Sequence, residues 1–213
     1  MVWILFASTA LAAYLAGSFP TGYIAGRAKG VDLRKEGSGN IGATNALRVL
    51  GKKMGYLVFA GDALKGALGV TLGFLIAAQL DPSRHTQAGV LAAIFTVIGH
   101  NYPVWLNFQG GKGISTSAGI MIALFPIWVF LSGLVAWMAL FFATRYVSVA
   151  SIAASIALPA SSAVLLMMGR CDPLLVVVAT AMCLLALYRH KENIQRLLAG
   201  TEKKFEKKSS TQS

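Results

Sequence analysis

Charged residues are scarce in this sequence. Asp, Glu, Lys and Arg together make up 13% of the 213 residues, and only 8 residues are acidic. A soluble domain has a charged fraction of about 25%, whereas this chain is 56% hydrophobic with a mean hydropathy of +0.65. The apolar residues form long blocks and do not alternate with polar ones. The composition therefore predicts an all-α, polytopic integral membrane protein with a single domain over residues 1–213.

Cysteines and clusters of metal ligands are also scarce. The two cysteines, Cys171 and Cys183, have neither metal-binding nor redox spacing. The three histidines stand in no cluster with Cys, Asp or Glu at the spacing that zinc sites use. We therefore expect neither a metal ion nor a cofactor.

Basic residues, in contrast, are in excess. The sequence has 19 Lys and Arg, and its formal net charge is +11. Such a balance can indicate nucleic-acid binding, but the basic residues here lie beside apolar segments, where they orient a chain in a membrane. We expect the lipid bilayer as a partner and no nucleic acid.

Apolar segments long enough to cross a bilayer recur along the chain. Pro126 interrupts residues 114–143, and we interpret this segment as two short spans; a single tilted helix is the alternative, and it would require another segment to be re-entrant. With this break the sequence predicts about seven transmembrane helices, some short or broken at proline. The predicted spans are 2–26, 55–80, 88–106, 114–143 as two, 149–169 and 174–188.

The distribution of basic residues predicts the orientation of these spans. Residues 27–53 contain seven Lys or Arg, and the tail from Arg189 contains another seven, together 14 of the 19. Cytoplasmic segments are enriched in Lys and Arg, so we expect both stretches in the cytoplasm and the N-terminus outside. Residues 107–113 and the polar break Arg145–Ser148 then share the cytoplasmic face. The polar motifs should converge there, and a basic, flexible tail should begin at about residue 203.

The first polar motif is Gly37–Asn45, with Arg48 one turn further on. Glycine-rich turns let backbone N–H groups wrap closely around a phosphate, and an arginine adds a bidentate fork. The motif matches G-x-G-x-x-G, but a dinucleotide site needs a hydrophobic strand before it, and residues 32–36 are mostly charged. A flexible loop would explain the Gly and Ser residues but not the side chains that bind oxyanions. The predicted substrate-binding residues are Gly39, Asn40, Gly42, Thr44 and Asn45.

A second glycine-rich turn, Gly110–Gly113, precedes an apolar segment. Gly113 stands where a Walker A motif needs Ser or Thr. A helix beginning behind the turn would direct N–H donors and its dipole at an anion; a plain turn between helices is the alternative. The other predicted substrate-binding residues are His100, Asn101, Thr116 and Ser148, and His190 and Asn193 are expected on the same face.

Asp62 and Lys65 lie one turn apart inside the second span. Charges inside a membrane are costly and usually paired. We therefore interpret them as an inward-facing ion pair, with direct contact to a substrate as the alternative.

Several motifs of lipid enzymes are absent. No histidine is followed five residues later by aspartate, as in the common CoA-dependent glycerolipid acyltransferases. The Asp-rich pattern of the CDP-alcohol phosphotransferases and the G-x-S-x-G elbow are also missing.

Three motifs together resemble those of the bacterial acyl-phosphate:glycerol-3-phosphate acyltransferases, the PlsY family. They are Gly37–Asn45 with Arg48, Gly99–Pro103 with Gly110–Gly113, and His190–Ile194 with Arg196 and Gly200–Glu202. The resemblance covers nearly the whole chain. It implies a seven-span enzyme of the bacterial inner membrane that transfers a fatty acyl group from acyl phosphate to the first hydroxyl of glycerol 3-phosphate. The products would be lysophosphatidic acid and phosphate, in the first acylation step of phospholipid synthesis.

The resemblance also implies roles for individual residues and partners. The predicted catalytic residues are Ser38, Arg48, His190 and Asn193, and those assigned to glycerol 3-phosphate are Gly110, Gly111, Lys112 and Gly113. The active site would face the cytoplasm. The enzyme that forms acyl phosphate and the next acyltransferase of the pathway would be its neighbours.

Acyl phosphate is already activated, so the transfer needs no covalent enzyme intermediate. The site must position two phosphoryl groups and stabilise developing negative charge. The substrate phosphate and His190 both remain candidates for the proton acceptor, and the acyl chain is expected in a groove between spans. The alternative functions are a small anion or phosphate transporter, which predicts polar motifs on both faces, and a scaffold whose basic tail binds anionic lipid.

Overall fold

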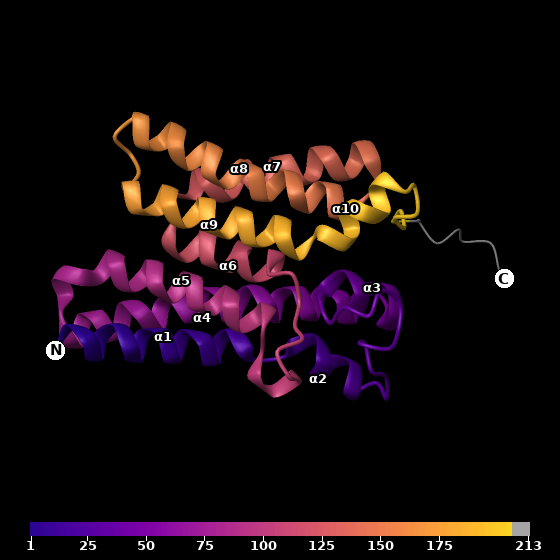
Figure 1. Ribbon diagram of the computed structural model, residues 1–213, viewed down its shortest axis with the longest axis horizontal. Coiled ribbons are helices and arrows are strands. Elements are labelled where there is room, and N and C mark those ends of the chain that lie inside the picture. The colour runs from indigo at the N-terminus through magenta and orange to yellow at the C-terminus, as the bar shows by residue number, and fades with distance from the viewer. Residues whose placement is uncertain (206–213) are drawn as a thin grey trace.

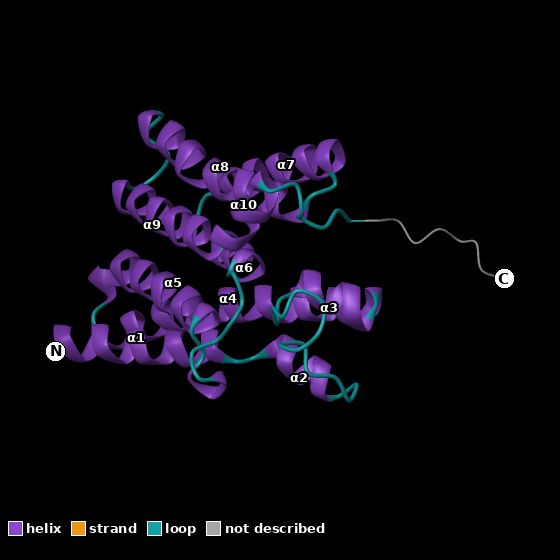
Figure 2. Cartoon of the chain, turned by 45° about the vertical axis from the view of Figure 1, so that its right-hand side comes forward, coloured by secondary structure: helices purple, strands orange, loops and turns teal. Residues whose placement is uncertain are grey.

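The computed structural model describes residues 1–205, and every regular element within them is a helix (Figures 1 and 2). The first half contains α1 (Val2–Ser18), α2 (Thr21–Arg27), α3 (Ala43–Leu50), α4 (Lys52–Leu80), the 3₁₀ turn η1 (Pro82–Arg84) and α5 (His85–Asn101). The second half contains the 3₁₀ turn η2 (Val104–Leu106), α6 (Ile114–Leu124), α7 (Ile127–Thr144), α8 (Val147–Met167), α9 (Pro173–Arg189) and α10 (Lys191–Leu198).

Prolines mark two of the helix breaks. Pro20 separates α1 from α2, and Pro126 separates α6 from α7. Proline lacks the N–H that would continue the hydrogen-bond ladder of the preceding helix. The predicted division of residues 114–143 into two helices is therefore confirmed. Pro159, in contrast, lies inside α8 without ending it.

The helices that could cross a membrane nearly match the predicted spans. Five segments are long and apolar enough, and α9 with α10 would make a sixth if that pair, bent by 55°, is one span. The other predicted span is α6, an apolar helix of 11 residues, which is shorter than the ~20 residues of a full crossing. The all-helical membrane fold is confirmed, whereas seven crossings and the orientation of the termini remain predictions. The five segments are Val2–Arg27, Lys52–Leu80, Pro82–Leu106, Ile127–Thr144 and Val147–Met167.

Large apolar side chains point outward from the helices. Trp3 is 85% exposed, Leu64 71% and Phe142 67%. A surface of this kind would be unfavourable in water but suits contact with lipid chains.

Small residues let the helices approach closely inside the bundle. α4 packs against α1, α3, α5 and α6. At the crossing of α4 and α6, a Cβ on Gly66 would lie 2.2 Å from the Thr116 carbonyl oxygen, and one on Gly119 would lie 1.8 Å from that of Ala63. Only glycine permits this contact, as is typical of helix packing in membranes. An apolar core from Val70 on α4 to Met182 on α9 then joins the two halves.

Successive long helices run in alternate directions, so the connections gather at two ends (Figure 1). The N-terminus and the α4–α5 and α8–α9 connections lie at one end, on the left of the view. Helices α2, α3 and α10 lie at the other end. The polar motifs at this second end come from segments that are far apart in the sequence.

Candidate active site

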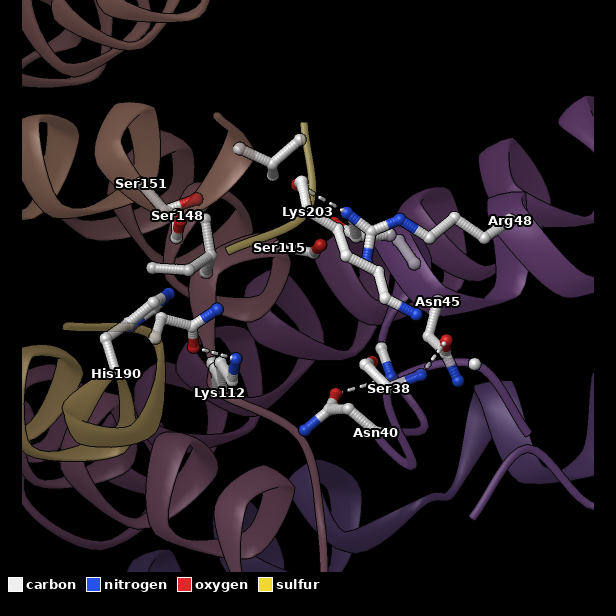
Figure 3. A pocket seen from close by; sticks show the side chains of 18 of the residues that line it. Ser38, Asn40, Asn45, Arg48, Lys112, Ser115, Ser148, Ser151, His190 and Lys203 are labelled. Carbon is white, nitrogen blue, oxygen red and sulfur yellow. Dashed lines mark hydrogen bonds between the residues drawn. The ribbon is translucent and has the colours of Figure 1, made fainter. Parts of the chain in front are cut away.

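A cavity of about 390 Å³ lies among α3, α4, α6, α7, α8 and α10. It brings together Ser38, Lys112 and His190, as predicted (Figure 3). A second cavity of about 240 Å³ shares Ser38 and Lys112 with the first, and Gly39 lines it. The other predicted residues that line the larger cavity are Asn40, Gly42, Thr44, Asn45, Arg48, His100, Gly113, Ser148 and Asn193.

The first glycine turn is held by Asn45. Its Oδ1 accepts a hydrogen bond from the Ser38 N–H at 2.9 Å, and its Nδ2 donates to the carbonyl oxygens of Leu33 at 3.1 Å and Glu36 at 3.0 Å. The side chain is 2% exposed, so both ends of its amide are occupied by the chain itself. Asn45 was predicted to bind substrate and does line the cavity; its amide folds the turn and leaves Ser38 exposed at the cavity.

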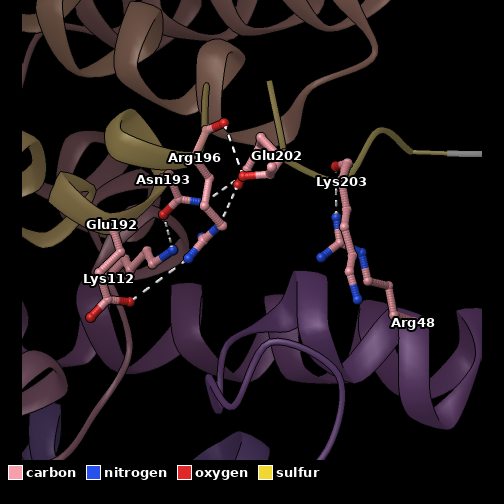
Figure 4. A network of polar contacts seen from close by, with 8 residues as sticks. Arg48, Lys112, Glu192, Asn193, Arg196, Glu202 and Lys203 are labelled. Atoms are coloured by element: carbon pink, nitrogen blue, oxygen red, sulfur yellow. Dashed lines mark hydrogen bonds and ion pairs between the residues drawn. The ribbon is translucent and has the colours of Figure 1, made fainter. Parts of the chain in front are cut away.

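Arg48 extends over the cavity from the last turn of α3. Its side chain is exposed, and its guanidinium donates a hydrogen bond to the carbonyl oxygen of Lys203 at 3.2 Å (Figure 4). The remaining N–H groups of the planar fork suit an oxyanion.

The second glycine turn is closed upon itself. The N–H groups of Gly110 and Gly111 donate to the carbonyl oxygens of Asn101 at 3.1 Å and His100 at 3.2 Å. A Cβ on Gly110 would lie 2.1 Å from the His100 carbonyl oxygen, and one on Gly111 would lie 2.2 Å from its Nε2. The N–H groups of Gly110 and Gly111 are therefore taken up by the chain, because the turn packs against the end of α5, and their assignment to glycerol 3-phosphate remains a prediction. Gly113, with φ +85°, lines the cavity and begins α6.

Lys112 is the charged group that this turn presents to both cavities. Burial lowers the pKa of its ammonium group to about 8, and the nearby Arg196 cation adds to this effect. The ammonium donates to the Asn193 Oδ1, and Asn193 Nδ2 donates to Glu202 Oε1 at 2.7 Å (Figure 4). Glu202 also forms an ion pair with Arg196 at 2.8 Å. In this network Asn193 fixes the direction of Lys112.

His190 lies between α9 and α10 and is 3% exposed. Its Nδ1 lies 2.8 Å from the carbonyl oxygen of Ala186. A carbonyl oxygen only accepts hydrogen bonds, so Nδ1 carries the proton and the Nε2 of the neutral ring has a free lone pair. This tautomer allows His190 to accept a proton within the cavity.

Three titratable side chains are buried beneath the cavity. Asp62 and Lys65 form an ion pair at 2.8 Å, with 3% and 7% of their side chains exposed. This confirms the predicted inward-facing pair, and Lys65 also donates to the carbonyl oxygen of Phe19 at the α1–α2 break, at 2.8 Å. The Nδ1 of His100 lies 3.7 Å from Asp62 Oδ1. Asp62 and His100 both line the cavity, whereas Lys65 lies behind Asp62 and reaches neither cavity.

Four of the predicted binding residues, including the first two glycines of the second turn, lie outside the lining of both cavities. Asn101 and Thr116 are 0% exposed and are absent from the lining of both cavities. Asn101 packs beside Gly113, and the backbone of Thr116 packs against Gly66 of α4. Both residues are adjacent to the motifs in the sequence, which suggested contact with substrate. In the structure, however, they lie on helix faces that point into the bundle.

The predicted tail begins too early. The backbone N–H of Phe205 donates to the carbonyl oxygen of Arg145 at 2.8 Å, and its ring packs edge-on against Phe141 with centroids 5.6 Å apart. Glu202 and Lys203 line the larger cavity. Lys203 thus belongs to the site and Phe205 packs against α7, and the rest of the predicted tail lies outside the described residues.

Sequence reasoning missed several lining residues. Ser151 follows Ser148 by three positions on α8, a spacing that places both on one helix face. Arg196 follows Asn193 in the same way on α10. The apolar members had no sequence signal, because they look like any other residue facing lipid. These missed apolar lining residues are Phe59, Ile114, Trp137 and Val147.

Comparisons with known proteins agree with this geometry. The family model described as "Glycerol-3-phosphate acyltransferase" matches residues 7–200. The chain is 46% identical over 206 residues to a glycerol-3-phosphate acyltransferase of Synechococcus elongatus, covering 95% of each chain. It is 38% identical over 202 residues to that of Bacillus subtilis, covering 94% of this chain and 98% of the relative.

Two solved structures have the same fold. They are crystal structures of PlsY (YgiH), an integral membrane glycerol 3-phosphate acyltransferase, in its glycerol 3-phosphate and lysophosphatidic acid forms. The first has a TM-score of 0.82 and 39% identity, and the match covers 94% of this chain and 96% of that one. The second has a TM-score of 0.80 and 38% identity.

Proposed function

The chain belongs to the glycerol-3-phosphate acyltransferase family, and we propose that it takes its acyl group from acyl phosphate. It is a membrane acyltransferase that acts on glycerol 3-phosphate and makes lysophosphatidic acid. The observation that best supports the proposed donor is the charge of the cavity. Arg48 and Lys112 come from distant segments and line one cavity large enough to hold an anionic head group beside the reacting hydroxyl.

Two adjoining cavities support the presence of two phosphorylated substrates. Ser38 and Lys112 line both cavities, so a cation and a hydroxyl donor would lie between the two phosphates. The larger cavity continues to apolar side chains of α4 and α7, Phe59 and Trp137. We assign the acyl phosphate to the larger cavity, with its chain against this apolar wall, and glycerol 3-phosphate to the smaller one.

The reaction is a single displacement at the acyl carbon. The sn-1 oxygen of glycerol 3-phosphate forms a bond to the acyl carbon, the bond from that carbon to the phosphate oxygen breaks, and phosphate leaves. Negative charge develops on the carbonyl oxygen and on the leaving phosphate. Arg48 is held by the Lys203 carbonyl oxygen and Lys112 by Asn193, and such preorganised donors stabilise this charge more than mobile water does.

The proton of the attacking hydroxyl goes either to His190 Nε2 or to the departing phosphate. The tautomer set by Ala186 favours His190, because Nε2 then has its lone pair free. If His190 is the base, His190→Ala should lower kcat by about 10²-fold or more with little change in KM. A rise in KM alone, measured by steady-state kinetics, would leave the phosphate as the acceptor.

The activity can be tested with purified protein in detergent micelles, acyl phosphate and labelled glycerol 3-phosphate. Formation of labelled lysophosphatidic acid without vesicles would support the enzyme and exclude pure transport. Acyl-CoA in place of acyl phosphate is the control for the donor. Turnover with acyl-CoA but not with acyl phosphate would overturn the proposed donor.

The location within the cell is also a proposal. The basic residues of 27–53 and of the tail support a cytoplasmic active site in a bacterial inner membrane. The substrate chemistry implies an enzyme upstream that makes acyl phosphate and a second acyltransferase downstream. With the native Cys171 and Cys183 replaced by alanine, single cysteines at Lys29 and Arg170, in loops at opposite ends of the bundle, would test the topology. A membrane-impermeant thiol reagent applied to intact cells should label only the cysteine at 170.

A further inference from the structure

Arg189, the last residue of α9, reaches across to the second glycine turn. Its Nε and Nη2 donate to the carbonyl oxygen of Gly111 at 3.2 and 2.8 Å, and Nη2 also donates to that of Gly110 at 3.0 Å. The guanidinium carbon lies 5.0 Å from the centre of the Tyr102 ring. A planar fork is needed to reach two carbonyl oxygens while stacking on an aromatic face, and lysine lacks one.

These bonds complete the hydrogen bonding of the two glycines. Their N–H groups already donate to the carbonyl oxygens of Asn101 and His100 at the end of α5. Each side of the turn is therefore attached to a different helix, α5 through the N–H groups and α9 through Arg189. Removal of the arginine would leave these two carbonyl oxygens without a donor, which is unfavourable for buried groups. The turn should then shift to find other donors and lose its attachment to α9.

The two ends of this connection are adjacent to reacting groups. Lys112 follows Gly111 in the chain, and His190 follows Arg189. Both line the larger cavity. The arginine therefore joins the segment that carries the cation to the segment that carries the imidazole.

We propose that Arg189 is a positioning residue that sets where Lys112 lies relative to His190, through its bonds to the carbonyl oxygens of Gly110 and Gly111. Arg189 also lines the smaller cavity, but the proposal assigns its effect to the bonds with the turn and not to a bond with the substrate. The inference rests on the proposed function, since it assigns Lys112 to a substrate phosphate.

The first test is Arg189→Ala in the detergent assay. A displacement of about 1 Å in a catalytic group can lower the rate about 10²-fold. Here the displaced group is Lys112, which is assigned to a substrate phosphate. We expect KM for glycerol 3-phosphate to rise about 10- to 100-fold, with a smaller fall in kcat. Arg189→Lys should recover only part of this loss, because an ammonium group cannot hold both carbonyl oxygens at once.

Chemical rescue distinguishes positioning from a general effect on folding. Free guanidinium added to Arg189→Ala should lower KM towards the wild-type value, whereas methylammonium at the same concentration should not. Arg170→Ala is the matched control, since Arg170 is an exposed arginine at the opposite end of α9. It removes the same charge and should leave KM and kcat unchanged.

Three results would overturn the proposal. They are a KM for Arg189→Ala within twofold of wild type, full recovery by Arg189→Lys, and equal rescue by both added cations. If Arg189→Ala does not fold, as judged by its melting temperature in detergent, Arg189→Lys alone decides: KM equal to wild type contradicts the proposal, and a clear rise supports it. Wild-type turnover in the same assay tests the proposed function separately, so failure of one is distinguishable from failure of the other.

Discussion

The two glycine-rich turns look alike in sequence but use glycine for different reasons. In the first turn, Gly37 and Gly39 have φ values of +65° and +71°, which side chains rarely allow. In the second, Gly110 and Gly111 are required by space, because a Cβ would lie 2.1 or 2.2 Å from atoms of His100. Gly39 is thus needed for the shape of the first turn alone, and Gly110 and Gly111 are needed for the packing of the second. Gly37 meets both demands, since a Cβ there would lie 2.2 Å from Asn45 Oδ1.

The difference extends to what each turn presents to the substrates. The first turn is stabilised by the Asn45 side chain and exposes Ser38. The second uses its N–H groups and carbonyl oxygens internally and presents a side chain, Lys112. A glycine-rich stretch thus indicates a tight turn, but not whether its backbone or a neighbouring side chain binds the ligand.

The strongest test of this contrast is Lys112→Met, which keeps a long side chain and removes its charge. If the second turn acts through its lysine, kcat/KM for glycerol 3-phosphate should fall about 10²- to 10³-fold. Lys112→Arg should lose less, because it retains a cation. A loss below tenfold for Lys112→Met, measured in the detergent assay, would mean that the backbone of the turn binds the phosphate after all.

The second test compares a glycine from each turn. Gly111→Ala should lower kcat/KM about 10²-fold, because the new methyl group displaces the turn from the buried His100 ring. Gly39→Asn should lose less than about tenfold, since asparagine tolerates positive φ and a Cβ there is 3.3 Å from its nearest neighbour, the Arg34 carbonyl oxygen. Equal losses in kcat/KM for the two variants would show that the two turns do not need glycine for different reasons.

The third test is the pH dependence of kcat/KM. Burial lowers the pKa of Lys112 to about 8, so the cation is present below this pH and is lost above it. Above about pH 8, kcat/KM for glycerol 3-phosphate should therefore fall by up to about tenfold per pH unit, since it reports groups of the free enzyme. Lys112→Arg should abolish this decline up to at least pH 10, because the pKa of arginine is above 12. An unchanged alkaline limb in that variant would assign the decline to another group.

The smallest expected effect concerns residues 203–205, whose Lys203 carbonyl oxygen accepts a hydrogen bond from Arg48. Deletion of 203–213 removes the carbonyl oxygen that Arg48 contacts and the Phe205 ring that packs on Phe141. We expect kcat/KM to fall about three- to tenfold, because Arg48 loses one solvent-exposed hydrogen bond to a carbonyl oxygen. Deletion of 206–213 alone is the matched control and should retain most activity. Equal activity of the two truncations would contradict a role for residues 203–205.

The sequence was sufficient for the location of the site. The long apolar blocks and the break at Pro126 predicted how often the chain reverses direction. From this count, loops 27–53 and 107–113 are expected at the same end of the bundle. Glycine, serine and basic residues concentrated in these loops then marked the residues that share the cavity. Ser38, Lys112 and His190 could be named because they stand in the three motifs that resemble those of the PlsY family.

Only the tertiary structure decided what the individual polar groups do. Asn45, Asn101 and Thr116 have the same residue types as ligand-binding side chains, yet the first folds its turn and the other two are buried. Arg189 resembles any basic residue at a helix end until its bonds to the carbonyl oxygens of Gly110 and Gly111 are seen.

Hydropathy and proline act locally along the chain, so the sequence by itself determined the helices, their breaks and the end at which the motifs meet. Hydrogen-bond partners, in contrast, depend on which carbonyl or N–H group a neighbouring helix brings within 3 Å. That choice is made only when distant segments such as α5 and α9 pack together. The tertiary structure alone therefore decided which polar groups remain free for substrate.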